Sequence, residues 1–504
     1  MSLLAVDMGS SSCKAVAFSA EGCALAHNTQ SYTVESPHPS WSEMSPAEFW
    51  RAFVTAIRAV AMQVGDDPVE ALAISSHGET FIPVDAQWRP IAPAILNADN
   101  RAGAEAKWLA DQIGPGPILD ITGLSPHPMY PLPKILWLRK NQPDVFLGAT
   151  CFLTLPGYLL TRLGMPAYVD HSLASRFLMF DIRKRRWSDE ILSACALPIE
   201  KFPTPVPAGT IAGDLSKATA SDLGLNSGTP VVLGGHDQPC AALGSGVLGP
   251  GRVSGSLGTY ECLVAASAAP ALRDVALAAN LNSYCHVVPD RFVTLAYFPS
   301  GIAIEWFVRL FHAAQGSPAS ASLNELCEEL ERRATPEPTG LCVTPHLLGS
   351  CNPDFDPNAT GVITGIRPHT TRADLYKGIL EGIACEFAAM VDLLQQATGP
   401  FEDVYISGGG GRSRLGLQLR AALANVTLHR MQCSEAVCLG TSILAGVAIG
   451  KFKTPASTVE KVVRDSETIP PDPAMAAQYA AQKMQYSTLY SSLAPFRSGL
   501  ARLN

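Results

Sequence analysis

Short apolar runs that end abruptly in glycine or polar residues recur along the chain. Aliphatic and β-branched side chains dominate these runs, which is typical of buried strands. The clearest runs are residues 3–6, 71–74, 231–233 and 404–406. The third run delivers His236, Asp237 and Gln238 after two glycines. A carboxylate in such a place is costly without a function or a partner, although an Asp at a strand-to-helix junction also often caps the helix.

Between the strands, apolar positions recur with the period of a helix. Helices are predicted for residues 46–64, 300–311, 371–394 and 415–423, and for a segment that starts at Glu435. Ser45, Pro46 and Glu48 make up the signature of a capped helix start.

The two halves of the sequence begin in the same way. Residues 7–14 include a turn rich in glycine and hydroxyl groups next to extended segments, and residues 251–264 repeat this pattern. The repeat indicates an ancient duplication, and 504 residues are too many for one ordinary core. We therefore expect two domains, 1–247 and 248–504.

Composition and charge argue against several classes of function. A net charge of -8 and a pI of about 5.8 disfavour nucleic acid or an anionic membrane as the main partner. The thirteen cysteines include no C-x-x-C pair, which disfavours a zinc ribbon or a thioredoxin-like motif and suits a reducing cytoplasm. No basic leader precedes Asp7, and the weakly polar run 436–450 is too short and too rich in glycine to span a bilayer.

Polar residues at the ends of two predicted strands suggest a binding cleft. His77 and Glu79 follow one buried strand, and Asp99 and Arg101 follow the strand after the next turn. Carboxylates accept hydrogen bonds from hydroxyl groups, and His and Arg donate to them, so these strand ends suit a hydroxyl-rich ligand. Surface salt bridges at loop tips explain the same residues equally well.

Three loops carry further candidate features. In the turn at 9–12, backbone amides, hydroxyl groups and Lys14 could hold an anion, although an ordinary polar hairpin is the simpler interpretation. The four glycines at 408–411 place bare amides before a helix, where phosphates can approach closely. They lack the ending of a P-loop and the spacing of a dinucleotide fingerprint. Residues 122–137, rich in proline and aromatic side chains, are predicted to form an ordered loop over the cleft.

Four signals stand in one order along the chain. They are D-x-G-S-S-S-x-K at 7–14, G-G-H-D-Q at 234–238, G-S-L-G-T at 255–259, and S-G-G-G-G-R-S at 407–413 followed by E-A-V-C-L-G-T-S-I-L-A-G at 435–446. Together they resemble the FGGY family of carbohydrate kinases, and the resemblance runs from Leu3 to about Gly450. It implies an α/β fold of two actin-like ATPase (ribonuclease H-like) domains, each with a mixed central sheet, and a cleft between them.

The resemblance also implies ATP and Mg²⁺ as cofactors and assigns roles to single residues. Asp237 would be the catalytic base, and both Asp7 and Asp237 would face the metal ion. The residues that would bind ATP lie in two phosphate loops and in the glycine run: Gly9, Ser10, Ser11, Lys14, Gly258, Thr259, Gly409 and Gly410. Glu435 matches a glutamate at the start of the last helix of the family, and its role stays open.

The residues expected to bind the sugar point to more than one substrate. They are His77, Gly78, Glu79, Asp99, Arg101, Tyr130 and Gln238. His77-Gly78 looks like the His-Gly of xylulose kinases, whereas Glu79-Thr80 looks like the Glu-Thr of glycerol kinases. The Arg and the substrate Tyr of glycerol kinases fall on Gly78 and Met129, which puts glycerol in doubt. The motifs around Asp237 also resemble those of fuculose kinases, but a small ketose such as the pentulose xylulose is favoured.

Two classes outside sugar kinases stay open as alternatives. One is a non-metabolic actin-like ATPase, which the polar strand ends at His77, Glu79, Asp99 and Arg101 argue against. The other is a sugar-binding regulator without catalysis, which the presence of both Asp7 and Asp237 argues against. The resemblance further implies a cytoplasmic enzyme with a small sugar as its partner, no nucleic acid or membrane partner, and homodimerisation, which is common among such kinases.

Overall fold

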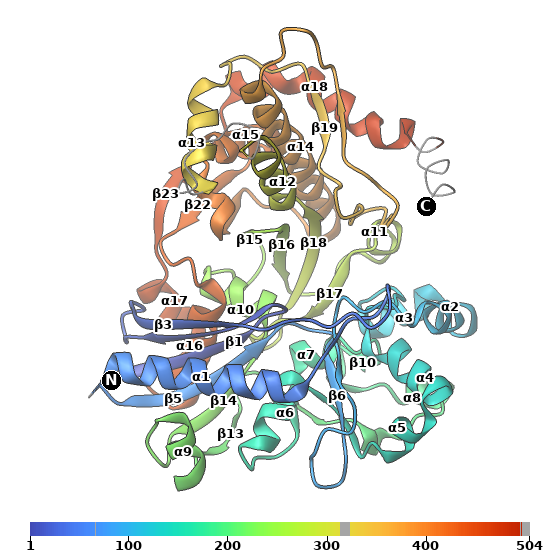
Figure 1. Cartoon of the computed structure of the whole chain (residues 1–504), viewed down its shortest axis with the longest axis vertical. Coiled ribbons are helices and arrows are strands. Elements are labelled where there is room, and N and C mark those ends of the chain that lie inside the picture. Colours follow the sequence, from blue (N-terminus) through green and yellow to red (C-terminus); the bar gives the residue numbers. More distant parts are fainter. Residues whose placement is uncertain (66, 313–322, 494, 496–504) are drawn as a thin grey trace.

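The computed structural model describes residues 1–65, 67–312, 323–493 and 495. Figure 1 shows two lobes along the long axis, with the N-terminal sheet in the lower lobe and the C-terminal sheet in the upper lobe. Each lobe is built around its own central sheet, and helices cover the sheets. The fold is therefore of the α/β class with two sheet-containing domains, as the sequence predicted.

The lower lobe contains a six-stranded mixed sheet with the order β13-β14-β5-β1-β2-β3. Its strands are β1 (Ser2–Met8), β2 (Ser12–Phe18), β3 (Ala24–Ser31), β5 (Val69–Ser76), β13 (Ile211–Asp214) and β14 (Pro230–His236). Strands β1, β5 and β14 run parallel, whereas β2, β3 and β13 are antiparallel to their neighbours. Three of the predicted apolar runs therefore form the parallel centre of this sheet.

The upper lobe contains a seven-stranded sheet with the order β17-β18-β16-β15-β21-β22-β23. Its strands are β15 (Arg252–Leu257), β16 (Tyr260–Ser267), β17 (Asn282–Cys285), β18 (Phe292–Pro299), β21 (Asp403–Ser407), β22 (Thr427–Met431) and β23 (Asp465–Ile469). Strands β15, β21 and β22 run parallel, and β16, β18 and β23 are antiparallel to their neighbours. Apart from the additional edge strand β17, the order from β18 to β23 repeats that of the lower sheet from β3 to β13, so the two halves of the chain share one topology.

The lobes meet at helices α10 (Asp237–Gly244) and α16 (Ala436–Ala448), whose backbones are in contact. A Cβ atom on Gly440 would lie 1.9 Å from the carbonyl oxygen of Cys240, and one on Gly244 would lie 2.0 Å from that of Ala436. Glycine is therefore required at both positions. Helix α16 also packs against β1, β5 and β14, so this late segment of the chain lies with the lower sheet (Figure 1).

Two long helices cover the sheets with apolar faces. Helix α1 (Pro46–Val64) packs on the lower sheet, and α14 (Arg372–Thr398) packs on the upper one. Thr371 and Asp374 form a complete capping box at the start of α14. The cap predicted at the start of α1 is wrong, because Ser45 makes no side-chain cap there. No helix among the described residues combines the length and apolar character needed to cross a membrane.

Smaller elements extend the lower lobe beside its sheet. They include β4 (Glu43–Met44), β6 (Phe81–Val84), β7 (Ala94–Ile95), β8 (Cys151–Thr154), α2 (Gly103–Gln112), α3 (Pro115–Thr122) and α4 (Pro131–Asn141). The prediction of a loop over 122–137 is wrong in its second part, because α4 starts at Pro131. Proline is favoured at the first position of a helix, where its missing N–H group costs nothing. Only the segment before it remains a loop.

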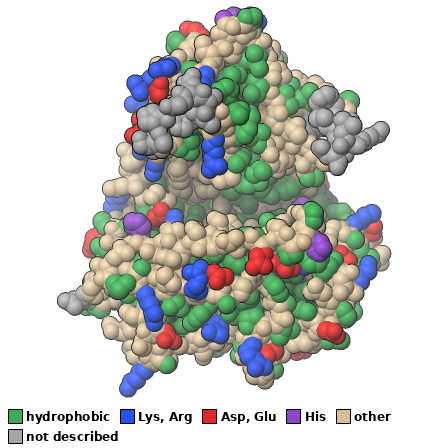
Figure 2. Space-filling model, in the orientation of Figure 1, with side chains coloured by type: hydrophobic (Ala, Val, Ile, Leu, Met, Phe, Trp, Pro, Cys, Tyr) green, Lys and Arg blue, Asp and Glu red, His purple; other side chains and the backbone are tan. Residues whose placement is uncertain are grey.

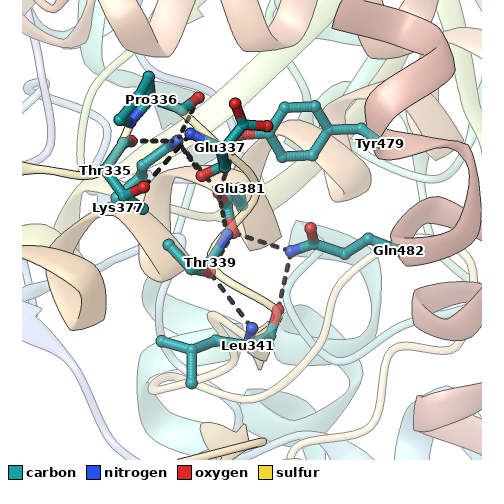
Figure 3. A network of polar contacts seen from close by, with 9 residues as sticks. All are labelled: Thr335, Pro336, Glu337, Thr339, Leu341, Lys377, Glu381, Tyr479 and Gln482. Carbon is teal, nitrogen blue, oxygen red and sulfur yellow. Dashed lines mark hydrogen bonds and ion pairs between the residues drawn. The ribbon is translucent and has the colours of Figure 1, made fainter. Parts of the chain in front are cut away.

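A buried carboxylate fastens the C-terminal helix α18 (Pro473–Ser492) to α14. Glu381 accepts hydrogen bonds from the hydroxyl of Tyr479 at 2.9 Å and from the amide of Gln482 at 2.9 Å, both in α18 (Figure 3). Its charge is also met by Lys377 at 3.7 Å, one turn away in α14. A fully buried carboxylate with such partners serves the fold.

Candidate active site

The strands β1, β5 and β14 end at one edge of the lower sheet, and this edge carries the predicted catalytic residues. In the strand register Asp7 lies beside Ser75, and Ser75 lies beside Gly235, two residues before Asp237. Because neighbouring strands are about 4.8 Å apart, the ends of β1 and β14 lie roughly 10 Å from each other. The loop after β5 begins between them. Figure 2 shows that the surface is recessed between the two lobes.

Asp237 is the first residue of α10, and its carboxylate has a free oxygen. The Oδ1 atom is buried and has no hydrogen-bond partner within the described part of the chain. His236 lies 3.3 Å away, but burial lowers its pKa well below the usual value, so the imidazole is neutral and its Nδ1 accepts from the amide of Gln238. Burial, and then the charges of Asp7 and Glu79, raise the pKa of Asp237 well above its ordinary value. Such a carboxylate is suited to accept a proton.

The first hairpin places a carboxylate opposite a lysine. Asp7 in β1 and Lys14 in β2 are direct cross-strand partners. Burial raises the pKa of Asp7 to about 6, and the charge of Lys14 and a hydrogen bond from Ser75 oppose this shift. Lys14 Nζ also lies 2.5 Å from Glu435 Oε2, at the start of α16, and the two side chains are 34% and 31% exposed. This half-exposed pair can be opened by a competing anion.

The tip of the same hairpin presents backbone and hydroxyl groups to solvent. The amide of Gly9 donates to the carbonyl of Ser12 at 2.9 Å and closes the turn. The Tyr32 hydroxyl donates to the carbonyl of Gly9 from below. Ser10 and Ser11 are exposed at the tip. The turn is therefore held in shape while its outer groups are open to a ligand.

The loop after β5 brings Glu79 against an arginine that the sequence prediction missed. Arg176 Nε donates to Glu79 Oε1 at 2.5 Å, and both side chains are buried. Glu79 has a φ of 62°, which is strained for a residue with a side chain. A Cβ atom on Gly78 would lie 2.7 Å from the ring of His236 and 3.1 Å from Cγ of Arg176, so glycine is required there. The available signal was a single charge within the apolar stretch 173–180, because a buried charge needs a partner.

Two tyrosines flank this arginine. Cζ of Arg176 lies 5.3 Å from the ring centroid of Tyr130 and 4.7 Å from that of Tyr284. The Tyr130 hydroxyl donates to Oδ1 of Asn282 at 2.9 Å. Asn282 and Tyr284 belong to β17, the edge strand of the upper sheet, so the site combines both halves of the chain. Asn282 and Tyr284 reach the site through tertiary contacts between the two lobes, and no local sequence pattern predicts this.

His77 lies beneath this site, and both of its ring nitrogens are engaged. Nδ1 donates to the carbonyl oxygen of Met8 at 2.8 Å, which leaves Nε2 to accept from the hydroxyl of Thr80 at 2.6 Å. Burial lowers the pKa of His77, so the ring is neutral. His77 therefore ties the loop after β5 to the end of β1.

Asp99 and Arg101 form a cluster of their own. Arg101 Nη2 lies 2.7 Å from Asp99 and 2.5 Å from Glu43, and the guanidinium group stacks 3.9 Å from the ring centroid of Trp41. Asp99 also accepts from the amide of Ser42 at 2.7 Å. The salt-bridge interpretation of these two residues is thus met, although the cluster is buried rather than at a loop tip. The role of Asp99 and Arg101 in sugar binding stays a prediction.

The upper lobe contains a cavity of about 270 Å³ beside the second hairpin. Gly258 and Thr259 line it together with Gly409 and Gly410, which form a 3-10 turn after β21. The remaining lining comes from the second hairpin itself, from α12 (Gly301–His312), α13 (Leu323–Arg333), α14 and α15 (Arg414–Ala424), and from the segments next to these helices. The structure therefore brings the predicted second phosphate loop and the predicted glycine run to one cavity. Bare amides at a helix start and an apolar wall suit a nucleotide.

A buried ion pair lies under this cavity. Arg420 in α15 donates from Nε to Glu261 Oε2 at 3.1 Å and from Nη2 to Glu261 Oε1, and its Nη1 donates to the carbonyl of Gly416 at 2.8 Å. Both charged side chains are 2% exposed. Glu261 lies in β16 of the second hairpin and Arg420 follows the glycine run, so the pair fixes these two loops to each other.

The carboxylates at the sheet edge fit a hard divalent cation. Asp7 is half-buried there, and Asp237 Oδ1 lacks a hydrogen-bond partner among the residues that are described. In the same residues no group of three or more His, Cys, Asp or Glu side chains could hold a metal ion alone. Mg²⁺ commonly uses one or two carboxylates and completes its shell with water and phosphate oxygens. Two carboxylates across this edge therefore suffice.

Comparisons with known proteins point in one direction. Residues 2–244 match the N-terminal domain of the FGGY family of carbohydrate kinases, and residues 253–449 match its C-terminal domain. The chain is 28% identical over 496 residues to xylulose kinase from Escherichia coli, covering 98% of this chain and 99% of that protein. It is also 28% identical to glycerol kinase 2 from Saccharolobus solfataricus, covering 93% of each. A xyloylose kinase structure from Brucella ovis superposes with a TM-score of 0.87 at 26% identity, covering 98% of this chain and 100% of that one.

Proposed function

The chain belongs to the FGGY family of carbohydrate kinases, and from this premise we propose that it transfers the γ-phosphoryl group of ATP to a hydroxyl of a small ketose. Family membership makes it a phosphotransferase whose acceptor is an alcohol group of a sugar. Sugar kinases of this family use ATP and a divalent metal. A pentulose such as xylulose is the favoured substrate, because several similar proteins are xylulose kinases and Gly78 leaves no side chain where glycerol kinases have an Arg.

The observation that carries the proposal is the free, buried Oδ1 atom of Asp237. Asp237 acts as the general base and takes the proton of the sugar hydroxyl. The new bond joins that sugar oxygen to the γ-phosphorus, while the bond from the γ-phosphorus to the bridging oxygen of ADP breaks. Phosphoryl transfer needs mainly positioning and charge stabilisation, which a fixed carboxylate and two phosphate loops can provide.

The nucleotide is held from both lobes. Gly9, Ser10, Ser11 and Lys14 contact the phosphates from the first hairpin, and Gly258, Thr259, Gly409 and Gly410 hold them and the nucleoside from the second hairpin and the glycine run. Asp7 and Asp237 would hold Mg²⁺, which neutralises charge on the phosphate oxygens when bound. In this arrangement residues 1–247 carry the first phosphate loop and most of the sugar side, and residues 248–504 carry the nucleotide side.

The sugar lies at the loop after β5. Glu79 and Tyr130 face it directly, Gly78 gives it room, and Gln238 borders Asp237. His77 supports this loop from below. A polyol or deoxyketose kinase of the glycerol or fuculose type is the second candidate, favoured by Glu79-Thr80 and by the similarity to glycerol kinase 2.

The proposal also covers the cellular compartment, the oligomeric state and the partner of the enzyme. All thirteen cysteines are free, which supports a reducing compartment such as the cytoplasm. A homodimer is proposed on the family resemblance alone. A small sugar is the proposed partner, and the net charge of -8 disfavours nucleic acid.

Replacing the base tests the proposal. Turnover is measured by coupled ADP release over a panel of ketoses and polyols with magnesium. We expect Asp237→Ala to lose about 10²–10⁴-fold in kcat, the usual contribution of a general base, while ATP still binds. Asp214→Ala, an exposed aspartate in β13 of the same sheet, is the matched control and keeps its activity. Near-normal turnover of Asp237→Ala would exclude the role, and a wild-type protein that no sugar stimulates would exclude the proposed function.

A further inference from the structure

Three polar atoms at the sugar side of the site are buried and lack a hydrogen-bond partner within the described residues. They are Oδ1 of Asp237, Nη1 of Arg176 and the hydroxyl of Tyr284. Their side chains are neighbours: Cζ of Arg176 lies 4.7 Å from the Tyr284 ring centroid, and that ring lies 5.3 Å from the ring of His236, which precedes Asp237. A buried polar group without a partner is costly, so three of them together indicate a missing ligand.

The guanidinium group of Arg176 is fixed in one orientation. Its Nε atom is held by Glu79 at 2.5 Å, and the rings of Tyr130 and Tyr284 lie on it at 5.3 Å and 4.7 Å. Arg176 is 2% exposed, so water does not satisfy its remaining nitrogen freely. Because Glu79 already neutralises the charge, the unpartnered Nη1 acts as a directed hydrogen-bond donor rather than as a site for an anion.

The two tyrosines of the site differ in their hydroxyl groups. The Tyr130 hydroxyl is engaged by Asn282 at 2.9 Å, whereas the Tyr284 hydroxyl has no partner among the residues described. Burial raises the pKa of Tyr284 well above its usual value, so the phenol keeps its proton and can donate it in a hydrogen bond. The site therefore offers two donors, from Arg176 and Tyr284, and one acceptor, from Asp237.

We propose that Arg176 and Tyr284 donate hydrogen bonds to the carbonyl oxygen of an open-chain ketose whose terminal hydroxyl lies at Asp237. A carbonyl oxygen has two lone pairs and no hydrogen, so it satisfies both donors, whereas an alcohol in its place brings a hydrogen that needs another acceptor. A 2-ketopentose in its furanose form has its C5 oxygen inside the ring and only its C1 hydroxyl remains terminal, so the hydroxyl placed at Asp237 is that of C5, which only the open-chain form offers. This inference rests on the proposed function and makes Arg176 and Tyr284 specificity-determining residues.

The test compares a 2-ketopentose with the pentitol obtained by reducing its carbonyl group. Wild-type kcat/KM is expected to favour the ketose. Tyr284→Phe keeps the ring and removes only the hydroxyl, and Arg176→Lys keeps the charge beside Glu79 while removing Nη1. For each variant we expect kcat/KM on the ketose to fall about 10- to 100-fold, the range for losing one buried hydrogen bond to a substrate. On the pentitol, kcat/KM or, where turnover is too slow, affinity by calorimetry should change by less than about threefold.

The outcomes separate a specificity role from a structural one. Tyr158→Phe, at a buried tyrosine in the core behind β1 and α1, is the matched control and should leave both substrates unaffected. Equal losses on ketose and pentitol would mean that Arg176 and Tyr284 only support the fold, and would overturn the inference. So would a wild-type enzyme that treats the two compounds alike, or variants that keep the ketose preference. A protein that consumes ATP with no sugar at all would instead refute the proposed function.

Discussion

The turn between β1 and β2 and the turn between β15 and β16 occupy equivalent places in the two lobes, yet their charges are arranged in opposite ways. In the first hairpin, Lys14 pairs with Glu435 and both side chains are about a third exposed, at 34% and 31%. In the second hairpin, Glu261 pairs with Arg420 and each side chain is 2% exposed. The two hairpins share one topology, but the ion pair of the first is accessible to solvent and that of the second is buried.

The difference separates a functional role from a structural one. A half-exposed pair contributes little to stability, and its lysine can leave the glutamate for a phosphate at small cost. A buried pair cannot exchange partners, because opening it leaves a charge in a medium of low dielectric constant. The first hairpin is thus suited to contact the phosphates that move in the reaction, and the second to hold a rigid wall for the nucleotide.

Breaking the buried pair should have the largest effect on stability. Glu261→Ala leaves the Arg420 guanidinium buried without its counter-charge, and we expect the free energy of unfolding to fall by about 3–5 kcal/mol. Urea denaturation measures this change. The control is Glu305→Ala, which removes the partner of Arg309 in a surface pair of α12 and should cost no more than about 0.5 kcal/mol. A loss below about 1 kcal/mol for Glu261→Ala would contradict the structural role.

The sequence predicted the hairpins but not the difference between them. Strand, turn and strand are local patterns, so residues 7–14 and 251–264 could be identified from alternation and glycine content. Whether a nearby charge is buried depends on a partner far along the chain: Glu435 lies 421 positions from Lys14, and Arg420 lies 159 from Glu261. No local pattern encodes such a pairing.

The same limit explains the errors at the sugar site. Arg176 was missed because its partner Glu79 is 97 positions away. The buried cluster around Asp99 and Arg101 could not be foreseen either, because the aromatic ring and the Glu43 carboxylate that engage it lie elsewhere in the sequence. Capping signatures were also ambiguous, since Thr371 forms its box and Ser45 does not. Catalytic candidates were located where a motif and a strand end coincide, as at Asp237.

Removing the exposed lysine should affect catalysis rather than stability. We expect Lys14→Met to lower kcat about 10²-fold, because one preorganised charge on the phosphates is lost. The free energy of unfolding should change by less than about 1 kcal/mol, since the pair with Glu435 is half-exposed. Lys107→Met, at an exposed pair with Asp111 in α2, serves as the control for both measurements. Turnover within about twofold of wild type would remove Lys14 from the phosphate site.

Asp7, the carboxylate of the first hairpin, should lower the free energy of unfolding by an amount that depends on pH and is smaller than the effect of breaking the buried pair. Burial raises the pKa of Asp7 to about 6 in the fold, against an ordinary value of 3.8. In metal-free protein, raising the pH above 3.8 ionises Asp7 in the unfolded chain first, so this group destabilises the fold progressively up to about pH 6 and by a constant amount above it. Asp7→Asn cannot ionise, so we expect it to be more stable than wild type by up to about 3 kcal/mol at pH 7.5 and nearly equal to it at pH 4.

Unfolding curves in the presence of a chelator, taken at half-unit steps between pH 4 and pH 7.5, measure this difference. Asp374→Asn gives the opposite sign, because the backbone amide of Thr371 holds the pKa of Asp374 below its ordinary value, so ionised Asp374 stabilises the fold as the pH rises. A gain for Asp7→Asn that is the same at every pH would show that the carboxylate is not strained by burial. The two hairpins would then differ only in the exposed pair of Lys14 and Glu435. The Asp7 carboxylate would not be a buried charge that a cation could stabilise.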